Sequence, residues 1–255
     1  MRGRLHGKTA LVTGGSRGIG RAIVNAYLSE GAHVIVNASR SESLASLQGD
    51  SDRVTLLPAD LASEAATSQL FTDAVAINGR LDILVNNAGI YIGKAFEDYS
   101  LAELEQLMRI NVYAVFQLTQ LAVRHMKPRG QGKIIQISST AGKWESPNQA
   151  AYNTSKHAIV GMSKCVALET APHGIQVNTI CPGMVNTDMF MDFESHASRA
   201  GITLDELKQA AIQRIPQGRF LEPPEIAHLA IYLGSDESNG MTGQTITISG
   251  GMRMA

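Results

Sequence analysis

Thr13-Gly14-Gly15-Ser16-Arg17-Gly18-Ile19-Gly20 lies between a β-branched run that starts at Thr9 and a helix-like run from Gly18 to Ser29. Glycines there allow a sharp turn and a close backbone approach to a pyrophosphate, and the first amides of the helix face the anion. A glycine loop alone is a weak signal, but its place between a strand and a helix strengthens it. We predict that this loop binds the phosphates of a dinucleotide.

Strand-like and helix-like runs alternate along the rest of the chain. Helix-like runs cover Leu101–Met126 and Ala150–Thr170. The strand-like runs are Thr9–Thr13, His33–Asn37, Val54–Leu57, Asp82–Asn86, Lys133–Ile137, Gln176–Ile180 and Thr245–Ile248. Apolar strands joined by crossover helices are typical of a parallel sheet covered on both faces. The pattern predicts an α/β fold with a doubly wound, Rossmann-type parallel sheet of about seven strands.

No internal repeat, low-complexity tract or linker interrupts residues 1–255, so we expect a single dinucleotide-binding catalytic domain. Residues 187–217 carry no strand pattern and are rich in Met, Phe, Ala and polar residues. They predict a helical insertion over one edge of the sheet, which we interpret as a substrate lid.

Composition limits the classes of function. The formal net charge of −1 gives no basic field for nucleic acid or an anionic membrane. No apolar run approaches the roughly 20 residues that span a bilayer, and no signal-peptide pattern opens the chain. The two cysteines, Cys165 and Cys181, fit neither a disulfide framework nor a metal-ligand spacing. We expect a cytoplasmic protein with no metal site.

The end of the second strand-like run, Val36-Asn37-Ala38-Ser39-Arg40, bears on the choice of dinucleotide. An NAD enzyme usually places a carboxylate there to bind the ribose hydroxyls, and this run has none. Ser39 can donate to a 2′-phosphate and Arg40 can pair with it, with Arg17 near by. We predict NADP rather than NAD. The alternative is that Arg40 faces solvent.

Tyr152 and Lys156 lie one helical turn apart, on one face of the run that begins at Ala150. A free tyrosine has a pKa near 10, and a neighbouring ammonium stabilises the phenolate. Ser139 precedes Tyr152 by 13 residues, just past a strand end, where its hydroxyl can hold a substrate oxygen. We predict that Tyr152 donates and accepts the proton. Taken alone, the Tyr152–Lys156 spacing is also typical of an ordinary amphipathic helix, and a serine after a strand is typical of a turn.

The chain resembles the short-chain dehydrogenase/reductase family over nearly its whole length. The resemblance rests on residues 13–20, Asp60-Leu61, Asn86-Asn87-Ala88-Gly89, Asn111, Ser138-Ser139, Tyr152 to Lys156 and Pro182-Gly183, in the family's order.

The resemblance implies catalytic roles for four residues. Tyr152 is the expected general acid/base, Ser139 orients the carbonyl, and Lys156 lowers the Tyr152 pKa and holds the nicotinamide ribose. Asn111, inside the predicted helix Leu101–Met126, belongs to a water-linked proton relay; otherwise it is a surface or capping amide.

Residues for the cofactor and the substrate follow from the same resemblance. The expected cofactor set is Gly14, Ser16, Arg17, Ile19, Gly20, Ser39, Arg40, Asp60, Leu61, Asn87, Ala88, Gly89, Tyr152, Lys156, Pro182, Gly183, Val185 and Thr187. The candidate substrate set is Ser139, Trp144, Gln149, Tyr152, Met184 and Met189. Trp144 either contacts substrate or packs its loop down. The run from Met189 to Phe193 either walls the pocket or forms the buried side of the lid.

We therefore expect an NADP-dependent oxidoreductase that interconverts a carbonyl and a secondary alcohol on a small or medium organic substrate. The C-terminal segment from Gly243 resembles 3-oxoacyl-thioester reductases, which dock an acidic carrier with basic residues near two helix ends. Lys127 and Arg129 fit the first place, but His173 stands where the second Arg is usual, and the insertion looks longer. A non-catalytic dinucleotide sensor is a second alternative, against which the complete catalytic set argues. The resemblance also implies a homo-tetramer that pairs its long helices, although apolar helix faces are equally expected inside this fold.

Overall fold

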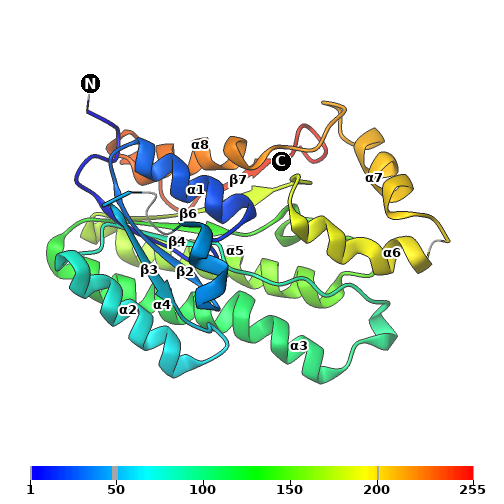
Figure 1. Ribbon diagram of the computed structural model, residues 1–255, viewed down its shortest axis with the longest axis horizontal. Helices are drawn as coiled ribbons and strands as arrows, with labels where there is room; N and C mark the ends of the chain where they lie inside the picture. Colours follow the sequence, from blue (N-terminus) through cyan, green and yellow to red (C-terminus); the bar gives the residue numbers. More distant parts are fainter. Residues whose placement is uncertain (1, 48–50, 200, 255) are drawn as a thin grey trace.

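The computed structural model describes residues 2–47, 51–199 and 201–254 and shows an α/β fold built on one parallel sheet (Figure 1). Seven strands pair in the order β3-β2-β1-β4-β5-β6-β7, all in parallel. Their bounds are β1 Thr9–Val12, β2 His33–Ala38, β3 Val54–Pro58, β4 Ile83–Asn86, β5 Gly132–Ile137, β6 Ile175–Pro182 and β7 Thr245–Ile248. The predicted doubly wound parallel sheet is confirmed.

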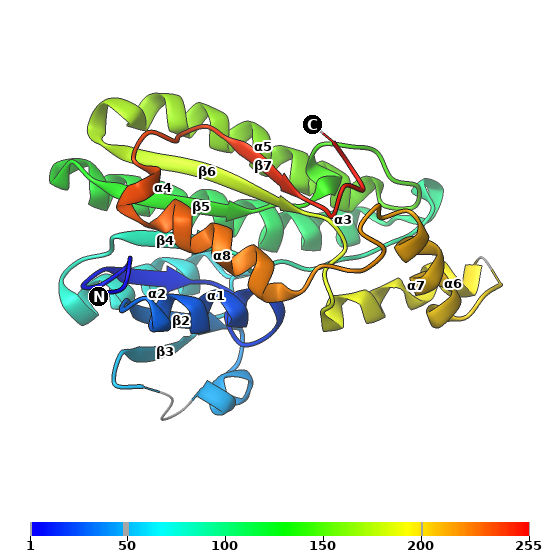
Figure 2. The ribbon, with the colours of Figure 1, turned by 90° about the horizontal axis from the view of Figure 1, so that it is seen from above.

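Helices cover both faces of this sheet (Figures 1 and 2). Two of them, α1 and α8, lie on one face, and α2, α4 and α5 lie on the other. The helices are α1 Gly18–Ser29, α2 Glu64–Asn78, α3 Leu101–Met108, α4 Ala114–Met126, α5 Ala150–Thr170, α6 Glu194–Arg199, α7 Leu204–Gln213 and α8 Pro223–Gly234. Among the described residues, none is long and apolar enough to cross a bilayer.

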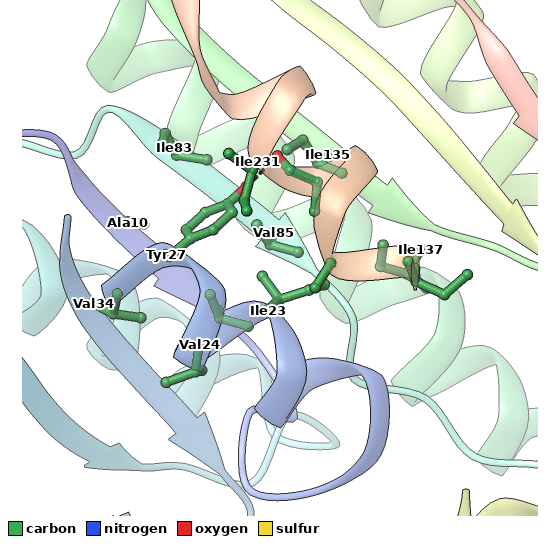
Figure 3. Packing of buried hydrophobic residues seen from close by; sticks show 14 of the residues in the cluster. Ala10, Ile23, Val24, Tyr27, Val34, Ile83, Val85, Ile135, Ile137 and Ile231 are labelled. Carbon is green, nitrogen blue, oxygen red and sulfur yellow. Dashed lines mark hydrogen bonds between the residues drawn. The ribbon is translucent and has the colours of Figure 1, made fainter. Parts of the chain in front are cut away.

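The core beneath α1 and α8 joins distant parts of the chain (Figure 3). Ile23 and Tyr27 of α1 pack with Ile231 of α8 over the sheet, and all three are at most 3% exposed. The Tyr27 hydroxyl donates a hydrogen bond of 2.8 Å to the Ala230 carbonyl. Burial of a polar hydroxyl is stabilising only when it has such a partner. Helices α1 and α8 are therefore held together as one layer.

The strand order indicates at which edge of the sheet a ligand is expected to bind. The chain reverses its winding direction between β1 and β4, and the connections after these strands diverge to opposite faces. In open parallel sheets, ligands bind in the crevice that this reversal leaves at the carboxyl ends of the strands. Figure 2 shows α6 and α7 projecting beyond the same edge.

Two helical segments that the sequence predicts are divided into shorter elements in the structure. The expected continuous helix Leu101–Met126 is wrong in detail, because a π-helical turn at Arg109–Tyr113 separates α3 from α4. The predicted helical insertion is present as a 3₁₀ turn at Asp188–Phe193 followed by α6 and α7. Residue 200, within that insertion, lies outside the described residues.

Candidate active site

A cavity of about 1080 Å³ opens at the carboxyl edge of the sheet. Pockets for drug-sized ligands typically span about 300–1,000 Å³, so this one has space for a dinucleotide and a small substrate together. Every cofactor and substrate residue predicted from the sequence lines it, and of the four predicted catalytic residues only Asn111 does not. The structure thus gathers residues from 14 to 189 around one space.

The glycine loop lines one end of the cavity. Gly14 adopts a φ of +61°, which favours glycine over residues with a side chain. The Thr13 hydroxyl accepts hydrogen bonds from the amides of Asn87 (3.0 Å) and Ala88 (3.1 Å). The Asn87 side-chain amide donates in return to the carbonyls of Thr13 and Gly14. These bonds fix the loop to the turn after β4, so that the amide end of α1 faces the cavity.

The far end of the cavity is lined by Ser39 and Arg40, which follow β2. The Asn37 side chain turns inward and donates to the backbone carbonyls of the β2–β3 region. It is 1% exposed, and no carboxylate replaces it at the end of β2. Arg17 lies 3.7 Å from the Asp188 carboxylate, with both side chains largely exposed. This edge therefore presents hydroxyl and guanidinium groups.

Tyr152 and Lys156 project from the first turns of α5, and both are buried. The Lys156 ammonium donates to the Ile137 carbonyl over 3.2 Å and lies 5.7 Å from the centroid of the Tyr152 ring. Burial disfavours the charged form of the amine and lowers the pKa of Lys156 to about 8. The ammonium is thus held between the end of β5 and the phenol.

The Tyr152 phenol is neutral at pH 7 in this structure. Burial raises the pKa of Tyr152 to about 12, and hydrogen bonding with the Ser139 hydroxyl opposes that shift. Ser139 begins a 3₁₀ turn after β5, where its oxygen accepts a 3.1 Å bond from the Ala141 amide. Burial of a phenolate raises the pKa of Tyr152 by more than the nearby Lys156 ammonium lowers it. The phenol therefore keeps its proton through the neutral range.

Asn111 is 1% exposed and lies behind the cavity wall, neither at the surface nor at a helix cap. Its side chain exchanges two hydrogen bonds with the Ile90 backbone and donates a third, of 3.1 Å, to the Ser155 hydroxyl. It lies in the π-helical turn, a distortion that is frequent at functional sites. Asn111 therefore connects the turn after β4 to α5.

The predicted substrate residues surround the space beside Tyr152. Trp144 lines the cavity and is also fixed, because the Lys143 ammonium lies 4.7 Å from its ring centroid. The Asn153 side chain donates to the Trp144 carbonyl. Both interpretations of this tryptophan thus have support. Gln149 and Met184 lie within the wall, and Met189 is 37% exposed at its rim.

Three residues of this wall were missed or left open by sequence reasoning. Tyr91 was not predicted, and its ring lies edge-on to Tyr152 with centroids 5.0 Å apart. Phe193 stacks on Tyr91 at 4.6 Å and 9°, and His196 hydrogen-bonds the Tyr91 hydroxyl. The available signal was position, since Tyr91 follows Gly89 of the predicted cofactor turn by two residues. Other unpredicted lining residues include Leu207, Ala210, Ala211, Arg214, Met252 and Arg253.

Comparison with known proteins identifies the family of the chain. Residues 8–198 match the family model described as short chain dehydrogenase. The chain is 37% identical to D-beta-hydroxybutyrate dehydrogenase from Cupriavidus necator, covering 97% of this chain and 98% of the relative. It is 34% identical to 3-oxoacyl-[acyl-carrier-protein] reductase from Aquifex aeolicus and 36% identical to NADP-dependent (R)-specific alcohol dehydrogenase from Lentilactobacillus kefiri, with 98% of each chain covered in both cases.

A solved structure is similar in fold as well as sequence. It is described as a putative gluconate dehydrogenase from Agrobacterium tumefaciens. The TM-score is 0.87 at 30% identity, with 97% of this chain and 96% of the other covered. The match covers nearly the whole chain, so it includes the helical insertion.

Proposed function

This chain belongs to the short-chain dehydrogenase family, whose members are oxidoreductases acting on CH–OH and C=O groups with NAD(P), and from that premise we propose an NADP-dependent interconversion of a carbonyl and a secondary alcohol on a small or medium organic substrate. One observation carries the proposal. Ser139, Tyr152 and Lys156 line the same cavity as the glycine loop, so the proton donor and the phosphate site share one space.

The residues present fit a dinucleotide. The amide end of the twelve-residue helix α1 opens into the cavity and suits a pyrophosphate, and Ser39 and Arg40 suit a phosphate on the adenosine ribose. When bound, the nicotinamide supplies the hydride. Asp60, Asn87 and Gly89 line the adenosine side, and Pro182, Gly183, Val185 and Thr187 line the nicotinamide side in this proposal.

The protein residues handle the proton and the geometry. In the direction of reduction, the Ser139 and Tyr152 hydroxyls hold the substrate carbonyl oxygen, and the neutral Tyr152 phenol donates its proton to that oxygen. The Lys156 ammonium favours the phenolate left behind. Asn111 holds the Ile90 backbone and, through Ser155, the first turns of α5. The same groups run the oxidation in reverse.

The acyl-carrier alternative has support from relatives with that activity, but one contact argues against it. Arg129, which fits the first carrier-docking place, donates to the Asp82 carboxylate over 2.8 Å and to the Leu81 carbonyl. Its guanidinium is therefore already paired. His173 is exposed after α5, where an arginine is usual in those reductases. A free carbonyl or alcohol is the preferred substrate class.

A substrate panel tests the proposal. Ketones, acyl-thioesters, sugars and secondary alcohols are assayed with NADPH, NADH and their oxidised forms, following the absorbance of the reduced nicotinamide. We expect turnover of free carbonyls with NADPH above NADH. Turnover of acetoacetyl-thioesters alone supports the carrier alternative. Tight dinucleotide binding without any turnover supports the sensor alternative.

A further inference from the structure

The helical insertion contacts the turn after β4 through two aromatic side chains. In Figure 1 the segment between β4 and α3 passes beneath α6, which lies beyond the carboxyl edge of the sheet. From the insertion, Phe193 stacks on the Tyr91 ring and His196 Nε2 lies within hydrogen-bond distance of the Tyr91 hydroxyl. These residues are separated by about a hundred positions in sequence, so the contact is a tertiary one.

Tyr91 also touches the residue that carries the chemistry. Its ring packs edge-on against Tyr152 at 5.0 Å and 72°, and both rings are at most 9% exposed. Edge-to-face pairs of this kind contribute about 0.5–1.5 kcal/mol beyond their buried area. Tyr91 is thus the intermediary between the insertion and the Tyr152 ring.

The chain leaves room for this hydrogen bond at Gly93. A Cβ atom built on Gly93 would collide with His196 Nε2 and the Tyr91 hydroxyl. Any larger residue must displace one of these two groups. The absence of a side chain at this position is therefore a requirement of the contact.

The protonation states define the direction of the bond. Burial raises the pKa of Tyr91 above its usual range, so the phenol is the donor. Burial and then the Arg199 guanidinium lower the pKa of His196, so Nε2 of a neutral imidazole accepts. Three further titratable groups lie near the pair, and each raises the pKa of Tyr91. They are Tyr99, Tyr152 and Asp192. An imidazolium cannot accept this bond and would have to donate to the Tyr91 oxygen instead, while burial and the Arg199 guanidinium disfavour the charged ring in this position.

We propose that Tyr91 is a positioning residue whose hydrogen bond to His196 and stack on Phe193 latch residues 188–199 closed over the substrate side of Tyr152. The inference rests on the proposed function, because it assigns the latch to the site in which Tyr152 is the proton donor. Its effect is on capture of the substrate, since the latch residues take no part in proton or hydride transfer.

Three variants separate the hydrogen bond from the ring packing. Tyr91→Phe keeps the contacts with Tyr152 and Phe193 and removes the hydroxyl. Gly93→Ala crowds the bond, and His196→Gln keeps an uncharged acceptor in place of the imidazole. We expect Tyr91→Phe and Gly93→Ala to raise KM for the carbonyl substrate by about 3- to 10-fold, the range of one lost hydrogen bond, with kcat within about 2-fold. Tyr113→Phe, at a half-exposed tyrosine, is the matched control and leaves KM unchanged.

The pH dependence of KM gives a readout that a purely structural role does not move. In the native protein, KM rises as the pH falls through the titration of His196, below the ordinary histidine range near 6.5. Tyr91→Phe has a high KM at every pH, and His196→Gln loses the acid limb with KM near the native value. A Tyr91→Phe variant with native KM, or an acid limb unchanged in His196→Gln, overturns the latch.

Amide hydrogen exchange keeps the two proposals distinguishable. Without substrate, Tyr91→Phe and Gly93→Ala should exchange faster than the native protein across residues 188–199, whereas strands β4 and β5 exchange at the native rate. Faster exchange supports the latch even in a protein that turns over no carbonyl, in which case the proposed function alone fails. If residues 188–199 exchange at the native rate in both variants, the latch is rejected, whether or not the protein turns over a carbonyl.

Discussion

The Asn111 side chain donates a 3.1 Å hydrogen bond to the Ser155 hydroxyl, which in turn donates over 2.7 Å to the Tyr152 carbonyl. This connection runs from the π-helical turn between α3 and α4 to the first turns of α5. It is entirely buried, so each member depends on the others for its hydrogen bonding. The backbone that carries Tyr152, the proposed proton donor, is thus held from the neighbouring helix.

Asn111→Ala is expected to cost both stability and turnover. The change leaves the Ile90 amide and carbonyl without their partner, and an unsatisfied buried polar group costs about 1–3 kcal/mol. Denaturant unfolding should show a lower midpoint, and kcat should fall without loss of dinucleotide binding. Native turnover in a destabilised variant would show that Asn111 acts on the fold alone.

Tyr152→Phe is expected to abolish turnover while keeping the cofactor. Removal of a positioned general acid typically costs about 10²- to 10⁴-fold in rate. The ring remains, so its packing with Tyr91 is preserved. Steady-state kinetics and a dinucleotide titration of the same preparation provide the check. Retained activity would exclude Tyr152 as the proton donor.

The pH profile of carbonyl reduction should report Lys156. Tyr152 stays protonated through the neutral range, because its pKa is raised to about 12 by burial. Burial lowers the pKa of Lys156 to about 8, so its ammonium is lost as the pH rises above that value. We expect kcat/KM to be flat between about pH 6.5 and 7, to reach about half of its plateau near pH 8 and to fall further above it. Lys156→Arg, which stays charged, should lose the break near 8 in whatever activity it retains.

Arg40→Ala should reduce the preference for NADPH. The guanidinium lines the cavity next to Ser39, where it can pair with a ribose phosphate. We expect kcat/KM to fall by about 10-fold or more with NADPH and to change little with NADH. Arg124→Ala, at an exposed arginine of α4, is the control for loss of charge. An equal loss with both cofactors would place Arg40 outside 2′-phosphate recognition.

The predicted tetramer can be tested on its exposed helix faces. Phe116 of α4 is 55% exposed and Leu168 of α5 is 80% exposed. If α4 and α5 pair between subunits, Phe116→Asp or Leu168→Asp buries a charge at the interface and dissociates the assembly. Light scattering after size-exclusion chromatography gives the mass. Phe96→Asp, at an exposed residue outside these helices, should leave it unchanged.

Much of the fold follows from local sequence patterns. Short β-branched runs predict all seven strands. The inner strands are mostly buried and rich in apolar residues, whereas the edge strands β3 and β7 are only partly buried. The break in Leu101–Met126 has no such signal. Its residues are compatible with an α-helix, and the π-helical turn accompanies tertiary bonds from Asn111 to Ile90 and Ser155.

The candidate site likewise has parts that the sequence predicts and parts that it does not. The glycine loop and the Tyr152–Lys156 pair are local motifs with fixed spacings, so they could be predicted from the sequence. The contact of Tyr91 with His196 could not, because nothing in a single sequence states which residues of the insertion meet the turn after β4. The high pKa of Tyr152 was also missed, since burial of its ring depends on residues far along the chain.

The hydrogen bond between Tyr27 and Ala230 bears on how the protein is made. The first turn of α1 lines the cavity of the candidate site, yet the inner face of this helix is completed by α8, which is synthesised about two hundred residues later. A growing chain on the ribosome therefore cannot finish packing α1 until α8 has emerged. If α1 binds a dinucleotide as proposed, a truncated product that stops before α8 should fail to hold it.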